Sequence, residues 1–369
     1  MGVPAVRAGI KLGTVQRASS LGCDGDREQG FGAVTPRRPA YRMKRREFIG
    51  AICGAAVASH FAAAAGQPGK VWRIGNVLPF SPERGGSFAQ MLQQRLVDLG
   101  YVEGRNVGLL TRFPGPQPDK IEEAVISVAL QADLLVVWGP IAALAAKKLS
   151  GNVPTVFISV SFPVEIGLVQ SLARPGGTMT GIAAEAAAET YGKRVQILKE
   201  IVPDLKRVAV LSPVGDPNIA FDIKSLGLAA RELGVSLLPV DIKSADELET
   251  AFANFRNNGA EALIVIRSAL ASAVAKQIAD LALAGHLPSC CAQPDLVMAG
   301  GLVSLGANLL DMIHPAAAHI DKIVKGTSPA DIPVEQPTRF ELYINLKTAR
   351  LLNLVIPPTL LARADEVIE

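Results

Sequence analysis

Short apolar runs alternate with amphipathic segments along the chain from Val71 onward. Residues 71–78, "VWRIGNVL", have the composition of a strand. Residues 88–100 place apolar side chains three and four positions apart, which is typical of one helix face, before a stop at Gly100. The same criteria predict strands at 106–113, 133–139, 153–160, 206–212, 236–242, 261–266 and 287–292, and helices at 117–131, 140–149, 191–201, 218–233, 245–255 and 272–284.

The regular order of these elements indicates the fold class. Strands that alternate with helices are typical of a parallel sheet covered by helices on both faces, and the continuous apolar run "DLLVVWG" at 133–139 suits a strand buried in this way. Two such series follow one another. They predict an α/β protein of two doubly wound, Rossmann-like lobes whose parallel sheets flank a central ligand cleft.

The residues after Gly300 do not begin a third lobe. They predict one strand and one long helix, which we expect to return to the first lobe and make the domains discontinuous. The predicted domains are lobe 1 at 70–184 plus about 307–335, lobe 2 at 185–306, and a C-terminal return segment at 336–369.

The stretch at 43–65 has the parts of an export signal. Three basic residues precede a weakly apolar run at 48–61 and alanines that end at Ala65. About 14 such residues are too few to cross a bilayer core, which needs roughly 20. We therefore expect a signal peptide that is cleaved near Ala65, and hence a periplasmic protein. The pair Arg45-Arg46 resembles the twin-arginine variant, and the general export route stays open.

Residues 1–42 show neither helical nor strand periodicity and are rich in Gly, Arg and turn formers. Two interpretations remain open for this segment. It is either a misannotated extension, with translation beginning at Met43, or a disordered one.

The basic character of the whole chain belongs to its first part. The formal net charge is +3, but residues 1–65 carry 10 Lys and Arg against 4 Asp and Glu, which leaves 27 basic and 30 acidic residues for the remainder. The part after the signal is therefore slightly acidic and lacks long basic runs. This balance argues against nucleic acid and anionic membranes as partners.

Cysteine and histidine spacing predicts neither a disulfide framework nor a metal site. The adjacent Cys290 and Cys291 read as buried packing residues at a strand end. The histidines His286, His314 and His319 show no spacing typical of metal ligands. No metal and no cofactor is predicted.

Motifs of common enzymes are missing from the sequence. There is no G-x-S-x-G elbow, no G-x-x-x-x-G-K-[ST] phosphate loop and no H-E-x-x-H helix, and "PERGGSF" lacks the spacing of a dinucleotide loop. The pair Glu122-Glu123 lies beside Lys120 on a predicted helix, which favours a solvated face. The sequence therefore predicts a binding protein and no catalytic residue.

Ligands of open α/β sheets bind beyond the carboxyl ends of the strands, and the residues at these positions are mostly small or hydroxyl-bearing. Arg267 stands out because a charge after a buried strand needs a partner. Asp216 suits a ligand ammonium or a helix cap, and Ser81, Gly139 and Ser161 suit an anion at a helix start or plain caps. The candidate ligand-binding residues are Phe80, Ser81, Gly139, Pro140, Ser159, Ser161, Phe162, Ser212, Asp216, Arg267, Ser268 and Gln293.

Several stretches resemble the substrate-binding proteins of ABC transporters, in the group of tryptophan/tyrosine-type solute-binding proteins with the type I periplasmic fold. The matching stretches are "MKRREFI" at 43–49, "LGYVEGRNV" at 99–107, "AALAAKK" at 142–148, "IGLVQSLARPGGTMTGI" at 166–182, "AGGLVSLG" at 299–306 and the closing segment at 336–369. The resemblance implies a monomeric exported receptor that captures a small solute, amino-acid-like or another small carboxylate. It would deliver the solute to an inner-membrane ABC permease.

Two departures from the family pattern bear on the solute. Phe162 in "SVSFPVEIG" stands where the family usually has an acidic residue, and Leu305 in "SLG" stands where it commonly has Tyr. We expect both to line the cleft and to favour a less cationic, more apolar solute. Alternative functions are a periplasmic ligand sensor for a membrane signalling receptor and, less favoured, a secreted Rossmann-type enzyme.

Overall fold

The computed structural model describes residues 70–149, 152–185 and 189–369. The residues from Pro68 to Glu369 form one compact unit. The predicted extension and signal peptide therefore lie outside the described residues. Within the described part of the chain, no helix combines the length and apolar character needed to cross a membrane.

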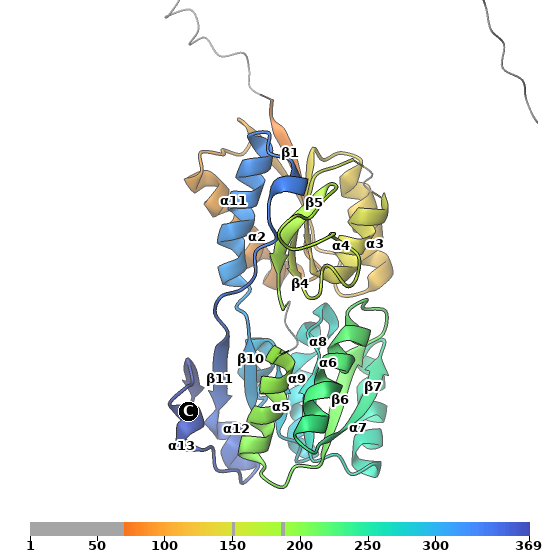
Figure 1. The fold of residues 1–369 in the computed structure, drawn as a ribbon, viewed down its shortest axis with the longest axis vertical. Helices are drawn as coiled ribbons and strands as arrows, with labels where there is room; N and C mark the ends of the chain where they lie inside the picture. Colours follow the sequence, from red (N-terminus) through yellow and green to blue (C-terminus); the bar gives the residue numbers. More distant parts are fainter. Residues whose placement is uncertain (1–69, 150–151, 186–188) are drawn as a thin grey trace, which may run out of the picture. The chain divides into compact units, whose positions relative to one another are not determined.

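The first lobe is built on a five-stranded sheet in which every neighbouring pair is parallel. Its spatial order is β2-β1-β3-β4-β5, and Figure 1 labels β1, β4 and β5 of this sheet. The strands are β1 (Trp72–Val77), β2 (Val107–Arg112), β3 (Leu134–Trp138), β4 (Thr155–Val160) and β5 (Met179–Ala183). All side chains of β3 are buried, as its unbroken apolar run predicts for a central parallel strand.

Helices cover both faces of this sheet. The helices are α2 (Pro82–Asp98), α3 (Pro118–Ala129), α4 (Gly139–Leu149) and α11 (Ile313–Val324). One apolar cluster joins α2 and α11 to the sheet, and another joins α3 and α4 to its opposite face. The long helix predicted after Gly300 is α11, and it packs against α2, β4 and β5.

The second lobe is built on a seven-stranded sheet with the order β12-β11-β10-β9-β8-β6-β7. Its strands are β6 (Arg207–Pro213), β7 (Ser236–Ile242), β8 (Ala262–Val265), β9 (Ser289–Cys291), β10 (Val303–Gly306), β11 (Glu341–Asn345) and β12 (Glu366–Ile368). The pair β10 and β11 is antiparallel, whereas the other neighbours are parallel. The purely parallel sheet that the sequence predicts is thus modified at one side, where β11 enters from the first lobe.

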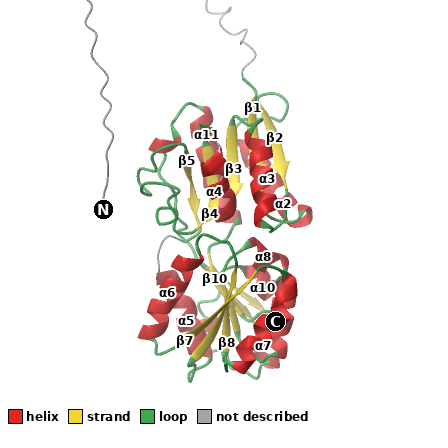
Figure 2. Cartoon of the chain, turned by 90° about the vertical axis from the view of Figure 1, so that its right-hand side faces the viewer, coloured by secondary structure: helices red, strands yellow, loops and turns green. Residues whose placement is uncertain are grey.

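The helices of the second lobe lie on both faces of its sheet (Figure 2). They are α5 (Glu189–Ile201), α6 (Ile219–Glu232), η1 (Ala245–Glu247), α7 (Leu248–Asn257), α8 (Ala269–Ala273), α9 (Ala275–Ala284), α10 (Pro294–Met298), α12 (Leu346–Leu351) and α13 (Pro358–Leu361). Two further one-turn 3-10 helices, η2 (Leu310–Met312) and η3 (Pro329–Asp331), flank α11. Cys290 and Cys291 are buried in separate apolar clusters on the two faces of β9, in agreement with the predicted packing role.

Three elements differ from their predicted form. Helix α2 begins at Pro82, six residues before the predicted start, because Ser81 and Pro82 provide a cap and a first turn. Strand β5 was not predicted, because the turn-forming Gly177 and the polar Thr178 directly before it interrupt the apolar pattern of a strand. The closing segment, predicted only as a return segment, contributes β11 and β12 to the second sheet.

The chain passes between the two sheets after β5, after β10 and before β11. The domain boundaries drawn from the sequence stay a prediction. The three passages matter for the site because they bring the carboxyl ends of both parallel sheets to one region of the compact unit.

Candidate ligand-binding pocket

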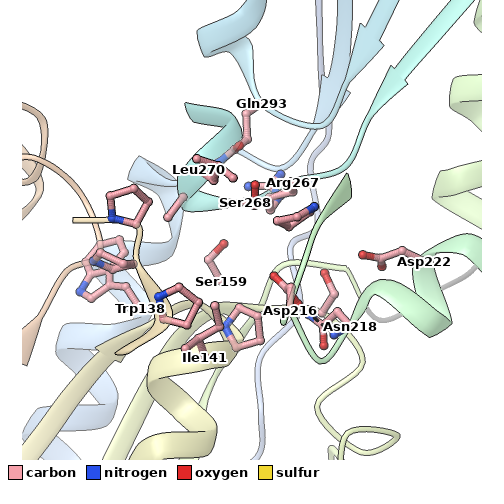
Figure 3. Close-up of a pocket in the computed structure, with 18 of the residues that line it drawn as sticks. Trp138, Ile141, Ser159, Asp216, Asn218, Asp222, Arg267, Ser268, Leu270 and Gln293 are labelled. Atoms are coloured by element: carbon pink, nitrogen blue, oxygen red, sulfur yellow. Dashed lines mark hydrogen bonds between the residues drawn. The ribbon is translucent and has the colours of Figure 1, made fainter. Parts of the chain in front are cut away.

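A pocket lies where the carboxyl ends of strands from both sheets meet. The first lobe contributes residues after β1, β2 and β3 and at the end of β4, and the second lobe contributes residues after β6, β7, β8 and β9, including Lys243. Figure 3 shows Trp138, Ile141 and Ser159 on one side and Arg267, Ser268 and Gln293 on the other. The pocket has a volume of about 80 Å³, counted as the space that the centres of water molecules could occupy. One water needs roughly 10–15 Å³ counted in the same way, so the pocket has room for a small organic molecule.

Most of the candidate residues named from the sequence surround this pocket. The nine that line it are Phe80, Gly139, Pro140, Ser159, Ser161, Asp216, Arg267, Ser268 and Gln293. They come together because parallel strands all end at the same sheet edge. Their contact with a ligand stays a prediction.

Ser81 and Ser212 lie near the pocket but have structural partners instead. The Ser81 hydroxyl accepts a hydrogen bond from the backbone N–H of Arg84 at 3.5 Å and caps α2. The Ser212 hydroxyl donates to Oδ1 of Asp241 at 2.5 Å, which ties β6 to β7. Neither side chain lines the pocket.

Phe162 and Leu305 do not line the pocket either, so the expectation that they shape the cleft is wrong. Phe162 is buried, and its ring lies 5.7 Å from that of Tyr191 and 5.9 Å from that of Phe221. Leu305 packs against the same apolar cluster, and its carbonyl accepts from Nε of Arg194 at 2.9 Å. Phe162 thus packs against Tyr191, and its backbone φ of 48° lies in the left-handed region.

Helices α5 and α6 supply pocket residues that the strand-end argument missed. Tyr191 from α5 and Asp222 from α6 both line the pocket, and the Tyr191 hydroxyl donates to Oδ1 of Asp222. A signal for Asp222 was present in the sequence. It lies three and four positions before Ser225 and Leu226, on the face of α6 that is buried. A carboxylate on a buried helix face requires a partner.

Burial perturbs both carboxyl groups on this side of the pocket. Desolvation raises the pKa of Asp216 to about 6, against a smaller lowering by the backbone N–H of Asn218, which donates to Oδ1 at 2.9 Å. Desolvation raises the pKa of Asp222 to about 7, a rise that the Tyr191 hydrogen bond opposes and the charges of Asp216 and Glu185 increase. Two buried carboxyl groups with raised pKa values favour a cation beside them.

Arg267 lines the same pocket and has donors without a partner among the described residues. Its Nη2 donates to the carbonyl of Ala292 at 2.8 Å and lies 3.4 Å from that of Ala307. Its Nε and Nη1 are shielded from water and have no hydrogen-bond partner among the described residues. Burial lowers the pKa of the guanidinium. Because unpaired buried donors are costly, these two atoms favour an anionic group such as a carboxylate.

The first-lobe wall is largely apolar. The indole N–H of Trp138 donates to Oδ1 of the buried Asn76 at 3.1 Å, so the ring and not its polar edge is offered to the pocket. Its apolar members also include Phe80, Ile141 and Leu309.

The hydroxyl of Ser159 reaches the pocket through an irregularity of β4. The register between β4 and β5 shifts between Ile158 and Val160, and Ser159 has a φ of 60°. A bulge of this kind redirects one side chain, and strained backbone persists where the surroundings enforce it. Figure 3 shows the Ser159 hydroxyl directed into the pocket. No cluster of His, Cys, Asp or Glu suited to a metal ion occurs within the described residues.

Comparisons with known proteins agree with this architecture. Residues 88–368 match the protein family described as ABC transporter substrate binding protein. A curated relative, the tyrosine-binding protein of Clostridioides difficile, is 24% identical over 262 residues, which cover 70% of this chain and 74% of the relative.

Solved structures show the same fold. A complex of an ABC domain with L-Trp from Streptococcus pneumonia superposes with a TM-score of 0.75 at 21% identity, covering 81% of this chain and all of the other. A conserved domain protein of Vibrio cholerae superposes with a TM-score of 0.74 at 23% identity, covering 82% of this chain and all of the other. The fold is that of type I periplasmic binding proteins, and the chain belongs to the ABC transporter substrate-binding protein family.

Proposed function

We propose that this protein is the extracytoplasmic receptor of an ABC importer and captures an amino-acid-like carboxylate by closure of its two lobes. It then delivers the solute, as a monomer, to an inner-membrane permease. Its relatives bind solutes and carry no catalytic role in their descriptions, and we infer no reaction for this chain. The family membership and the pocket between the strand ends of both lobes support the proposal.

The observation that carries the proposal is the guanidinium of Arg267. Two of its nitrogen atoms are buried and have no hydrogen-bond partner among the described residues, and the residue lines the pocket. A ligand carboxylate would neutralise the guanidinium and accept a charge-assisted hydrogen bond from it. An uncharged ligand such as a sugar would leave the charge without a counterion.

Asp216, Asp222 and Tyr191 support a second charge on the ligand. Burial is the main cause of the raised pKa values of both carboxyl groups, and the charge of Arg194 opposes the rise for Asp222. A ligand ammonium beside these groups would stabilise their charged forms further. The expectation of a less cationic solute depended on Phe162 lining the cleft. Because Phe162 does not line the pocket, we infer the charge of the ligand from Asp216 and Asp222 instead. The relatives named for tyrosine and crystallised with L-Trp are consistent with an amino-acid-like ligand.

Thermal unfolding tests this function directly. The purified protein is partly unfolded and refolded to remove carried-over ligand, and is then heated with amino acids, small carboxylates, purines or sugars. A ligand that binds only the folded state stabilises it by about 2.7 kcal/mol at a hundredfold excess over Kd. We expect the midpoint to rise with amino acids or small carboxylates. A rise confined to sugars or purines would contradict the proposal.

A further inference from the structure

One ion pair joins the two lobes away from the chain passages. Arg84, in the first turn of α2, donates from Nη2 to Oδ2 of Asp295, in the first turn of α10. Helix α2 covers the first sheet and α10 lies on the second, as their labels in Figure 2 show. Each other ion pair among the described residues joins groups of one lobe or of the segments that connect the lobes.

Both partners of this ion pair are attached to walls of the pocket. The guanidinium of Arg84 lies over the ring of Phe80, 5.1 Å from its centre, and Phe80 lines the first-lobe wall. On the other side, the Ser272 hydroxyl lies 3.0 Å from Oδ2 of Asp295 and 3.1 Å from Oε1 of Gln293, a residue of the second-lobe wall. The ion pair therefore connects the two walls indirectly, through Phe80 on the first-lobe side and through Ser272 and Gln293 on the second-lobe side.

The environment of this ion pair makes it stronger than an ordinary surface pair. The side chains of Arg84 and Asp295 are 28% and 22% exposed, whereas those of Arg95 and Asp98 on the same helix are 48% and 47% exposed. Reduced solvent screening strengthens the attraction, and Nε of Arg84 is itself shielded from water. The stacking on Phe80 holds the guanidinium in the direction of Asp295.

We propose that Arg84 and Asp295 form a clasp that stabilises the closed arrangement of the lobes. The two residues are positioning residues, since neither lines the pocket. If ligand binds the closed form, affinity scales with the fraction of protein that is closed. Loss of the clasp would therefore weaken binding of every ligand by the same factor and leave the order of preference unchanged. Loss of a residue that touches the ligand would change that order.

The clasp is tested by measuring lobe separation without any ligand. Spin labels at Gln90→Cys on α2 and Gln277→Cys on α9 report the distance between the lobes, because both positions are exposed. Cys290 and Cys291 are buried and escape labelling, and Cys23 and Cys53 are replaced by serine. Arg84→Ala should reduce the ratio of closed to open protein about tenfold, as expected for a half-buried charge pair. Salt at 1 M should shift the parent in the same direction, because the screening length falls to about 3 Å.

Two further variants separate the clasp from simple damage to α2. Arg95→Ala removes the exposed pair of the same helix and should leave the distance distribution of the parent unchanged. The exchange Arg84→Asp with Asp295→Arg should restore the closed population that either single change removes. Identical distributions for the parent and Arg84→Ala, or no recovery in the exchange variant, would overturn the clasp. The measurement needs no solute, so its outcome is independent of the function proposed above.

Discussion

The two walls of the pocket differ in chemistry although both are built from strand ends. The first-lobe wall offers rings and aliphatic groups, with Trp138 and Ile141 as examples, and its indole N–H is already bonded to Asn76. The second-lobe wall holds the titratable residues Lys243, Arg267 and Asp222. Two guanidinium nitrogens of Arg267 have no partner among the described residues, and burial raises the pKa of Asp222 to about 7. This difference supports the proposal that the second lobe binds the charged groups of a ligand, whereas the first lobe covers its apolar part.

The largest effect is expected from neutralising Arg267 in the second-lobe wall. Arg267→Gln keeps a hydrogen-bonding side chain but removes the charge, so we expect Kd for a carboxylate ligand to rise about 100-fold, or roughly 2.7 kcal/mol. Calorimetric titration measures this change. The matched control is Arg207→Gln, which removes an arginine at the far end of β6. An equal loss of affinity in both variants would argue against Arg267 as the carboxylate partner.

The carboxyl groups of the same wall predict a pH dependence of stability. Their pKa values of about 6 and 7 exceed the ordinary value of 3.8, so the folded protein binds more protons than the unfolded chain between about pH 4 and pH 7. Stability of the ligand-free protein should therefore fall as pH rises through this window. Asp222→Asn should flatten the fall by on the order of 2 kcal/mol in denaturant titrations at pH 5 and pH 8.

A ligand ammonium would reverse this trend for binding. Because the ammonium favours the charged forms of the two carboxyl groups, the affinity for the ligand should increase between pH 5 and pH 8. The increase should be smaller in Asp222→Asn. An affinity that falls over this range would contradict an ammonium beside Asp216 and Asp222.

Whether the sequence predicted a pocket residue depends on the element that carries it, a strand end or a helix. Gly139 and Arg267 follow buried strands directly, so the rule that parallel strands end at one edge was enough to find them. Tyr191 and Asp222 come from helices, and their position depends on how α5 and α6 pack after the chain enters the second lobe. Sequence spacing does not encode that packing. The charged residue on the buried face of α6 was the one available signal.

The misplacement of Phe162 has a similar cause. It follows β4 by two residues, as a pocket residue should, but its backbone is left-handed and its side chain is buried in the core beside Tyr191. A positive φ at a bulky residue is uncommon and is imposed by the surrounding structure. The fold class followed from the alternation of elements, whereas the antiparallel β11 depended on a chain reversal between lobes.

Changes in the first-lobe wall should have a smaller effect than those in the second. Trp138→Phe retains an aromatic ring and loses only the bond to Asn76, so ligand affinity should change by less than about threefold while stability falls by about 1–2 kcal/mol. Calorimetric titration and denaturant unfolding measure the two quantities. A loss of affinity as large as that of Arg267→Gln would erase the proposed difference between the walls.

The smallest effect on binding is expected outside both walls. Ser81→Ala removes the cap of α2 and should cost about 1 kcal/mol of stability without altering Kd, because the hydroxyl faces Arg84 and not the pocket. Thermal unfolding and titration with the same ligand measure the two effects. A marked change in Kd would return Ser81 to the binding residues.

Titration with three matched compounds tests the charge-reading wall most directly. L-phenylalanine carries both charges, 3-phenylpropionate lacks the ammonium, and phenethylamine lacks the carboxylate. We predict measurable binding of L-phenylalanine, and at least about tenfold weaker binding of each of the other two, because each leaves one buried charge of the wall unpaired. Equal affinity for L-phenylalanine and either single-charge compound would contradict the claim that Arg267 and the pair Asp216 and Asp222 read opposite ends of the ligand.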